Sequence, residues 1–395
     1  MTSHTAPRTT RGPVRRGERA LAPDLARGVM LLIIALANVA GVVFAGEPGL
    51  DPSPEGVDRG LTFLLYDLAH ARGYPVFAVM FGYGIVQLAR RQLASGATPE
   101  QVRGVLVRRN LWLVAFGVVH GTLLYYGDFL GAYGIVGLTM TLVLLRRGDK
   151  FHRIALGIWA LATVEVVGLG VIVVARIFGG SSGSASLPVG HVDSLDATDY
   201  LTSVVDRLGE WPVHTATALP FILIAWLGMW AARRRVLEEP ARHRTMLRWT
   251  AVVGVGLSVL GGLPAALVAA GWLDVPASTA ELVLLLHGGS GMFAGPGYVA
   301  VFGLVVARIT RPGPVVGALS ALGRRSLSGY LVQSVAWLVL FAPFTLALDE
   351  RSPLPTLTAV VAAALVWLIT VLVARALGDR PGPAETVLRR LTYRT

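Results

Sequence analysis

Long apolar runs recur from one end of the chain to the other and alternate with short polar segments. An α-helix needs about 20 consecutive apolar residues to cross the hydrocarbon core of a bilayer. Runs of this kind predict ten membrane-spanning helices, near residues 25–45, 74–92, 104–126, 130–146, 153–177, 211–232, 248–272, 280–307, 326–347 and 355–376. The pattern therefore predicts an all-α, polytopic integral membrane helical bundle.

Positive charge collects in alternate connections between these runs. Arginine clusters precede the first run and follow the second, fourth, sixth, eighth and tenth, whereas the segments around residues 47–58 and 193–210 carry mainly acids. Short cytoplasmic loops of membrane proteins accumulate Arg and Lys. We therefore expect both termini to be cytoplasmic and the acidic loops to face outward.

Composition agrees with a membrane protein, since 54% of the residues are hydrophobic and 15% are charged. The formal charge of +11 comes from arginines spread over alternate loops, so no nucleic acid is expected as a partner. Cysteine is absent, which excludes disulfides, thiol nucleophiles and cysteine metal sites. The histidines are scattered, and we expect no metal site.

The chain divides into two parts. Residues 1–20 are rich in Arg, Thr, Pro and Gly and are expected to form a disordered basic arm. Residues 21–395 are expected to form a single integral membrane domain, because no linker separates the apolar runs.

The first run contains a polar stripe. Asp24, Arg27 and Asn38 are three and eleven residues apart, spacings that place them on one face of a helix. In one interpretation Asp24 and Arg27 form an ion pair at the cytoplasmic end, while Asn38 bonds to a neighbouring helix. In the other, Arg27 contacts a phosphate at the inner mouth of a cavity.

His120 and Asp128 are ionisable residues at membrane depth, where such groups cost about 3 kcal/mol or more and usually persist for a function. A neutral His120 can act as a general base or make a helix–helix hydrogen bond. On an unbroken helix Asp128 would lie about 12 Å further along the axis. A direct pair therefore requires a break near Gly127.

Other polar residues lie near the outer boundary or inside the runs. Asp67 and His70 are expected in a solvated interfacial turn, although they could converge with His120. His287 precedes a glycine- and proline-rich stretch, of the kind seen in broken helices that line sites. Glu165 lies near the middle of its run and fits a proton relay or a neutral, hydrogen-bonded acid.

The sequence lacks the short motifs of well-known enzyme families: it contains no Walker loop, no HExxH and no GxSxG. Five segments nevertheless resemble the YeiB-type bacterial membrane proteins that carry the domain of unknown function 418. They are DLARG at 24–28 followed by Asn38, FAVMFGYG at 77–84, the block 120–133, GRRSLSGYLVQS at 323–334 and GPAETVLRRLT at 382–392. The resemblance covers nearly the whole chain, and the part from about 230–395 resembles the domain itself. Thr386 stands where the family tends to have an aromatic residue.

The opening Asp-x-x-Arg-Gly helix of this family is similar to that of the transmembrane acyltransferases, including heparan-alpha-glucosaminide N-acetyltransferase. The resemblance implies transfer of an acyl group from cytosolic acyl-CoA to an acceptor across the membrane. The histidine of that relative lies in its first outer loop, whereas residues 46–57 here contain none. His70 or His120 would have to replace it.

The function expected first is therefore acyl transfer from cytosolic acyl-CoA to an extracytoplasmic hydroxyl or amine. Arg27 would bind phosphate, His120 would deprotonate the acceptor, and Asp128 would orient that base, with Asp24, Asn38, His70 and His287 around the substrate path. The alternatives are a transporter of a small metabolite or lipid-linked molecule, with Glu165 coupling to protons, and a non-catalytic membrane protein. No cofactor is expected to be tightly bound. Expected partners are the lipid bilayer of the bacterial plasma membrane, acyl-CoA, a cell-envelope acceptor and, as one option for assembly, a second copy in a homodimer.

Overall fold

The computed structural model describes residues 21–179 and 183–393, so the predicted arm at 1–20 lies outside the described residues. Nearly all of the regular structure is helical. The helices are α1 (Leu21–Val43), α2 (Gly56–Leu68), α3 (Gly73–Ala94), α4 (Pro99–Leu123), α5 (Leu130–Thr139) with the π-helical turn η2 (Met140–Leu144), α6 (Asp149–His152), α7 (Ile154–Phe178), α8 (Asp193–Asp196), α9 (Tyr200–Ala218), the 3-10 turn η3 (Leu219–Phe221), α10 (Ile222–Arg233), α11 (Arg244–Ala269), α12 (Ala277–Gly291), α13 (Ala294–Val306), α14 (Pro314–Gly323), α15 (Ser326–Phe341), α16 (Pro355–Ala376) and α17 (Pro383–Tyr393).

Each predicted run overlaps helical structure. Among the described residues, 6 helical segments are long and apolar enough to cross a membrane: Leu21–Val43, Asp149–Phe178, Tyr200–Arg233, Arg244–Ala269, Ala277–Val306 and Pro355–Ala376. Three of them join two or more of the helices named above. The protein is therefore an all-α protein with several helices suited to spanning a membrane.

Two predicted runs have an end more than five residues away from its position in the structure. The run predicted at 326–347 stops at Phe341, because Ala342 is extended (ψ 141°) and precedes Pro343. A residue before proline is forced out of the helical region. The run predicted at 211–232 begins at Tyr200 instead, where the Asp199 carboxylate caps α9 by accepting from the backbone N–H groups of Leu201 and Thr202.

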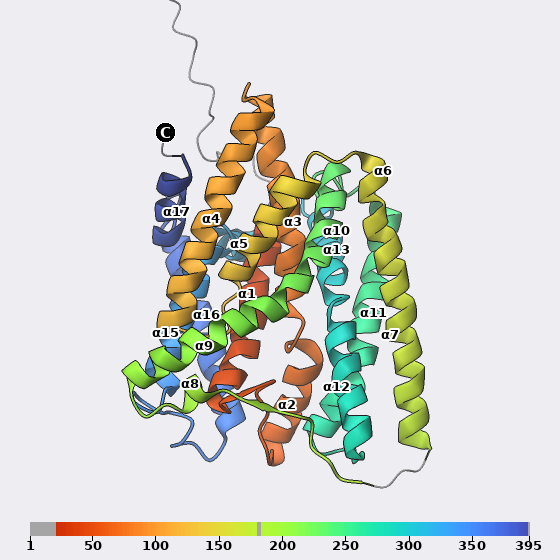
Figure 1. Ribbon diagram of the computed structural model, residues 1–395, viewed down its shortest axis with the longest axis vertical. Coiled ribbons are helices and arrows are strands. Elements are labelled where there is room, and N and C mark those ends of the chain that lie inside the picture. The colour runs from red at the N-terminus through yellow and green to blue at the C-terminus, as the bar shows by residue number, and fades with distance from the viewer. Residues whose placement is uncertain (1–20, 180–182, 394–395) are drawn as a thin grey trace, which may run out of the picture.

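Glycine residues allow α1 and α14 to pack closely against each other. Gly28 of α1 faces α14, and a Cβ atom added there would lie 2.0 Å from the carbonyl oxygen of Leu319. A Cβ atom at Gly323 would lie 1.7 Å from the carbonyl oxygen of Asp24. These two glycines bring the backbones of α1 and α14 into direct contact, a packing common between membrane helices. α1 lies in the middle of the bundle, and α7 lies at its edge (Figure 1).

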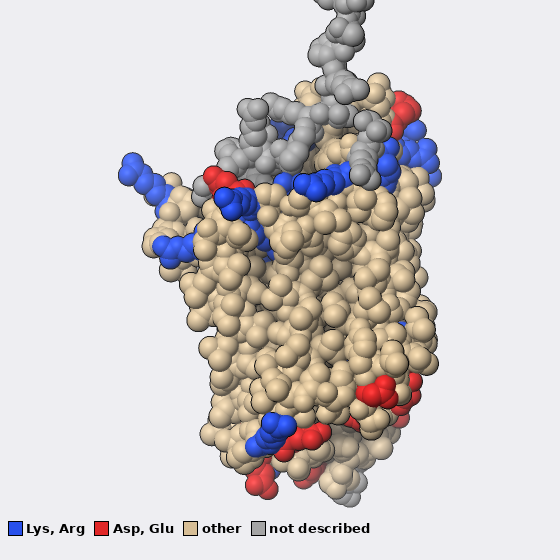
Figure 2. Space-filling view, turned by 90° about the vertical axis from the view of Figure 1, so that its left-hand side faces the viewer, with Lys and Arg blue, Asp and Glu red and all other residues tan. Residues whose placement is uncertain are grey.

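The two ends of the molecule differ in charge. Arginine and lysine side chains gather at one end, and most of the visible acidic side chains gather at the other (Figure 2). We call the first the basic end; it carries the α3–α4 turn, the C-terminal end of α10 and helix α17 (Figure 1). We call the other the acidic end; it carries α2, α8 and the short antiparallel pair β1 (Gly46–Glu47) and β2 (Gly190–His191), with Gly46 opposite His191.

Candidate functional site

A deep cavity of about 820 Å³ opens among the helices that meet at the basic end. Along α3 its lining extends from Tyr74 to Ala94. These residues are 20 positions apart, which corresponds to about 30 Å of helix, the thickness of a hydrocarbon core. The cavity therefore penetrates most of the bundle.

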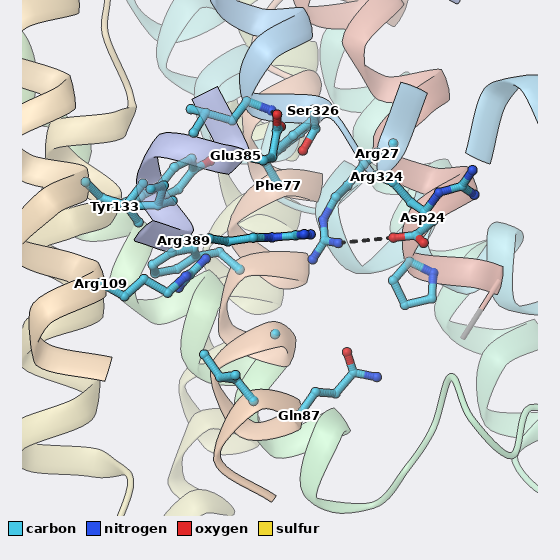
Figure 3. A pocket seen from close by; sticks show the side chains of 18 of the residues that line it. Asp24, Arg27, Phe77, Gln87, Arg109, Tyr133, Arg324, Ser326, Glu385 and Arg389 are labelled. Carbon is cyan, nitrogen blue, oxygen red and sulfur yellow. Dashed lines mark hydrogen bonds and ion pairs between the residues drawn. The ribbon is translucent and has the colours of Figure 1, made fainter. Parts of the chain in front are cut away.

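The part of the cavity near its mouth, at the basic end, is rich in arginine. It is lined by Arg27, Arg90, Arg91, Arg109, Arg235, Arg324 and Arg389, together with the acids Asp24, Glu238 and Glu385. Arg27 and Arg389 extend toward one another across the cavity (Figure 3). Arg27 pairs with Asp24 at 3.6 Å, as one interpretation of the sequence predicted. Seven guanidinium groups against three carboxylates suit a ligand with several negative charges, because guanidinium matches phosphate bidentately.

Helix α17 forms part of this charged wall. Glu385 accepts hydrogen bonds from the backbone N–H groups of Leu327 (2.9 Å) and Ser328 (3.2 Å) and so caps the N-terminus of α15. A carboxylate is stabilised there by the helix dipole. No membrane-spanning run is predicted at α17, since its residues are too polar to cross a bilayer.

The inner part of the cavity is aromatic. It is lined by Tyr74 and Phe77 of α3, Phe129 and Tyr133 at the start of α5, and Tyr330 of α15. Tyr133 donates a hydrogen bond to the carbonyl oxygen of Tyr74 (2.8 Å), which fixes this end of the cavity. An elongated ligand with a charged head and an apolar tail fits this division of the lining.

A Ser–His–Asp arrangement lies next to the inner end. His120 of α4 contacts the Asp128 carboxylate through Nδ1 (2.8 Å) and the Ser334 hydroxyl through Nε2 (2.8 Å). With the proton on Nδ1, His120 donates to Asp128 and accepts from Ser334. All three side chains are at most 2% exposed. The ring of Tyr330, which lines the cavity, lies 4.9 Å from the His120 ring.

The helix break that a direct His120–Asp128 contact requires is present between α4 and α5. Helix α4 ends at Leu123 and α5 begins at Leu130. Asp128 folds back across the break, where it accepts from the backbone N–H groups of Leu130 (3.0 Å) and Gly131 (2.8 Å). Trp211 of α9 also donates to it through Nε1 (3.4 Å). These donors fix the carboxylate in place, with Oδ1 against the His120 ring.

Ser334 was missed as a site residue. It occurs in the resemblance segment 323–334, but a serine in a membrane helix often bonds only to its own backbone, so its type carries no functional signal. Only the folded bundle places the Ser334 hydroxyl of α15 beside His120 of α4.

The other two predicted histidines form a separate cluster. His70 Nδ1 and His287 Nε2 are 2.9 Å apart, and Tyr66 stacks on both rings at 4.8 and 4.4 Å. Arg72 donates to the His287 ring (3.0 Å) and to the carbonyl oxygen of Ser258 (2.9 Å). This cluster shares no residue with the His120 arrangement, so the structure does not bring His70 and His287 to His120.

The expected solvated turn at Asp67 and His70 is wrong. Asp67 is 5% exposed and Arg72 is fully buried, because the segment is covered by α11. A Cβ atom at Gly262 of α11 would lie 2.0 Å from Arg72 Nη2 and 2.7 Å from Asp67 Oδ1, so only glycine leaves room. Burial, followed by the positive charge of Arg72, lowers the pKa of His70 to about 3. His70 is therefore neutral at physiological pH.

Two further predicted residues lie outside the cavity lining. Asn38 is half-buried on α1 and is not a lining residue, so the predicted stripe divides after Arg27. Glu165 lies on the exposed face of α7. The predicted weak point after His287 is present, because α12 ends at Gly291 and α13 begins at Ala294.

Comparison with known proteins gives a consistent picture. Residues 231–395 match the family model described as protein of unknown function DUF418. The chain is 27% identical to the uncharacterized protein YeiB of Escherichia coli over 95% of this chain and 97% of that protein. It is 25% identical to the uncharacterized protein YxaH of Bacillus subtilis over 80% of this chain and 78% of that protein. Over 32% of this chain it is 34% identical to an uncharacterized 39.9 kDa protein of Bacillus acidopullulyticus, of which it covers 35%.

Proposed function

Because the chain belongs to the YeiB-like family that carries DUF418, we propose that it is a multi-pass acyltransferase of the bacterial plasma membrane. It takes an acyl group from cytosolic acyl-CoA and transfers it to a hydroxyl or amine of a cell-envelope acceptor. The observation that carries the proposal is the arginine-lined cavity that ends beside His120 and Ser334.

In this proposal the basic end and both chain termini face the cytoplasm. The charge difference between the two ends supports this orientation, since cytoplasmic segments retain Arg and Lys. The mouth of the cavity then opens to the compartment that contains acyl-CoA. The acidic end faces outward, toward the acceptor.

The lining explains how the donor is held. The phosphates of acyl-CoA bind the arginines at the mouth, with Arg27 as the first contact, and its long apolar arm follows the aromatic inner part of the cavity. The thioester then reaches the neighbourhood of Tyr330. The donor is thereby ordered before reaction, which removes much of the entropic cost of bringing two substrates together.

His120 supplies the base. Asp128 fixes the ring through Nδ1 and stabilises the imidazolium that forms when Nε2 takes a proton.

The test measures binding and turnover of radiolabelled acetyl-CoA and longer acyl-CoAs by the purified protein in nanodiscs. Arg27→Ala is expected to weaken binding about tenfold or more, because a charge-assisted contact is lost. His120→Ala is expected to bind the donor normally but to lower its turnover at least about 100-fold.

Two matched variants serve as controls. Arg103→Ala removes an exposed arginine of α4 that does not line the cavity, and His191→Ala removes an exposed histidine at the acidic end. Both should behave as wild type. Unchanged turnover in His120→Ala, or binding that no acyl-CoA saturates, would overturn the proposal.

One observation favours a second candidate. A cavity that is deep from one end and closed at the other by Tyr330, Phe129 and Tyr133 is also the shape of one state of an alternating-access transporter. Net flux of an anionic substrate into liposomes without a chemical product would support transport instead.

A further inference from the structure

We infer that Ser334 is a nucleophile that carries the acyl group covalently between donor and acceptor. This inference rests on the proposed acyltransferase function and goes beyond it, because a general base alone would allow direct transfer from acyl-CoA to the acceptor. A covalent acyl-serine divides the reaction into two steps.

The geometry around His120 supports this assignment. His120 Nε2 is already occupied by the Ser334 hydroxyl at 2.8 Å, so the group nearest to the base is a serine of the protein. On the other side, Nδ1 is bound to a carboxylate at 2.8 Å. A serine activated by a base that a third group orients is the general arrangement of nucleophilic catalysis.

Burial keeps bulk water away from Ser334. Ser334 is 1% exposed and lies one helical turn after Tyr330 on α15, so bulk water does not reach it in this state. Tyr330 borders both the cavity and the His120 ring. Rotation of this one side chain would join the cavity to the serine, and exclusion of water would protect an acyl-serine from hydrolysis.

The two steps balance as follows. Ser334 Oγ attacks the thioester carbonyl, its proton passes to His120 Nε2, and the C–S bond breaks as the CoA sulfur leaves with that proton. The acceptor hydroxyl or amine then attacks the acyl-serine, and His120 takes its proton. The bond between the acyl carbonyl carbon and Ser334 Oγ breaks, and His120 returns the proton to Oγ. No oxidant, reductant or further reactant is required.

The first experiment uses a fluorophosphonate probe, which phosphonylates an activated serine with loss of fluoride and needs no acyl-CoA. Mass spectrometry of the protein in nanodiscs should locate the adduct on Ser334. Labelling should disappear in His120→Ala and should become faster in Tyr330→Ala, which opens the path from the cavity. Ser258→Ala is the matched control, because Ser258 is another fully buried serine and lies on α11.

A second measurement uses the absence of cysteine from the chain. Ser334→Cys places a single thiol against His120, and its alkylation by iodoacetamide should be at least tenfold faster than that of Ser258→Cys. The difference should vanish when His120 is also replaced by Ala. A merely structural serine would not produce this dependence on His120.

The outcomes distinguish the covalent step at Ser334 from the acyltransferase function. Labelling of Ser334 without any use of acyl-CoA would leave the nucleophile standing and remove the acyltransferase. Acyl transfer at the wild-type rate in Ser334→Ala would retain the acyltransferase and overturn the covalent step. Failure of both probes to react at position 334, in wild type and in Tyr330→Ala, would also overturn it.

Discussion

Single residues of this protein act through partners that lie far away along the chain. Asp128 stabilises α5 through two backbone N–H groups and at the same time holds the His120 ring. Arg72 joins the α2–α3 connection to α11 and α12 through Ser258 and His287. A buried charge with several partners is costly to disturb, because removal of one partner leaves the others unpaired.

At this scale we predict a pH effect from His70. Its pKa is lowered to about 3, so below its ordinary value of 6.5 the unfolded chain binds a proton that the folded protein does not. The free energy of unfolding should therefore fall as pH drops from about 6.5 toward 3, by up to about 1.4 kcal/mol per pH unit. His70→Gln should flatten this dependence.

Thermal unfolding in detergent at pH 7 and pH 5 measures the effect. His191→Gln, at an exposed histidine of β2, should keep the wild-type difference between the two pH values. An equally steep loss of stability in His70→Gln would contradict the assignment.

Helix breaks and close contacts at glycine residues position the helices of this protein. The breaks between α4 and α5 and between α12 and α13 each place a histidine-bearing helix end inside the bundle. The contact of α1 with α14 depends on Gly28 and Gly323. Since α1 carries Asp24 and Arg27, and Arg324 follows α14, this contact also shapes the cavity mouth.

The second prediction concerns this helix contact. Gly323→Ala should lower the free energy of unfolding by about 1 to 3 kcal/mol, because its Cβ atom would overlap the carbonyl oxygen of Asp24. Gly317→Ala, on the same helix with no atom within 4 Å of its added Cβ, should be neutral or stabilising. Denaturation of the two variants side by side checks this, and equal stability would argue against the close approach.

The described part of the molecule is a bundle with opposite charge at its two ends and a cavity whose arginine-rich lining belongs to the basic end. This polarity gives the proposed reaction a direction, with the donor at the basic end and the acceptor at the acidic end. The orientation in the membrane therefore decides which compartment supplies each substrate.

The third prediction tests this orientation with single cysteines in the cysteine-free chain. Ser53→Cys, exposed at the acidic end, should react with a membrane-impermeant maleimide in intact cells. Gly148→Cys, exposed at the basic end, should react only after the membrane is permeabilised. The reverse pattern would invert the proposed topology and would place the cavity mouth outside the cell.

The sequence was sufficient to predict the membrane class, the helical positions and the polar residues that needed an explanation, because hydrophobic period and charge distribution are local properties. It also stated the condition for the His120–Asp128 pair, since eight residues on a continuous helix keep two side chains apart. Which polar residues meet could be seen only in the folded bundle. His120 and Ser334 are 214 residues apart, and His70 and His287 are 217 apart. Such contacts depend on how helices pack, and packing is set by shape across the whole bundle rather than by any local pattern. The burial of Asp67 beneath Gly262 and the arginine-lined cavity arise in the same way.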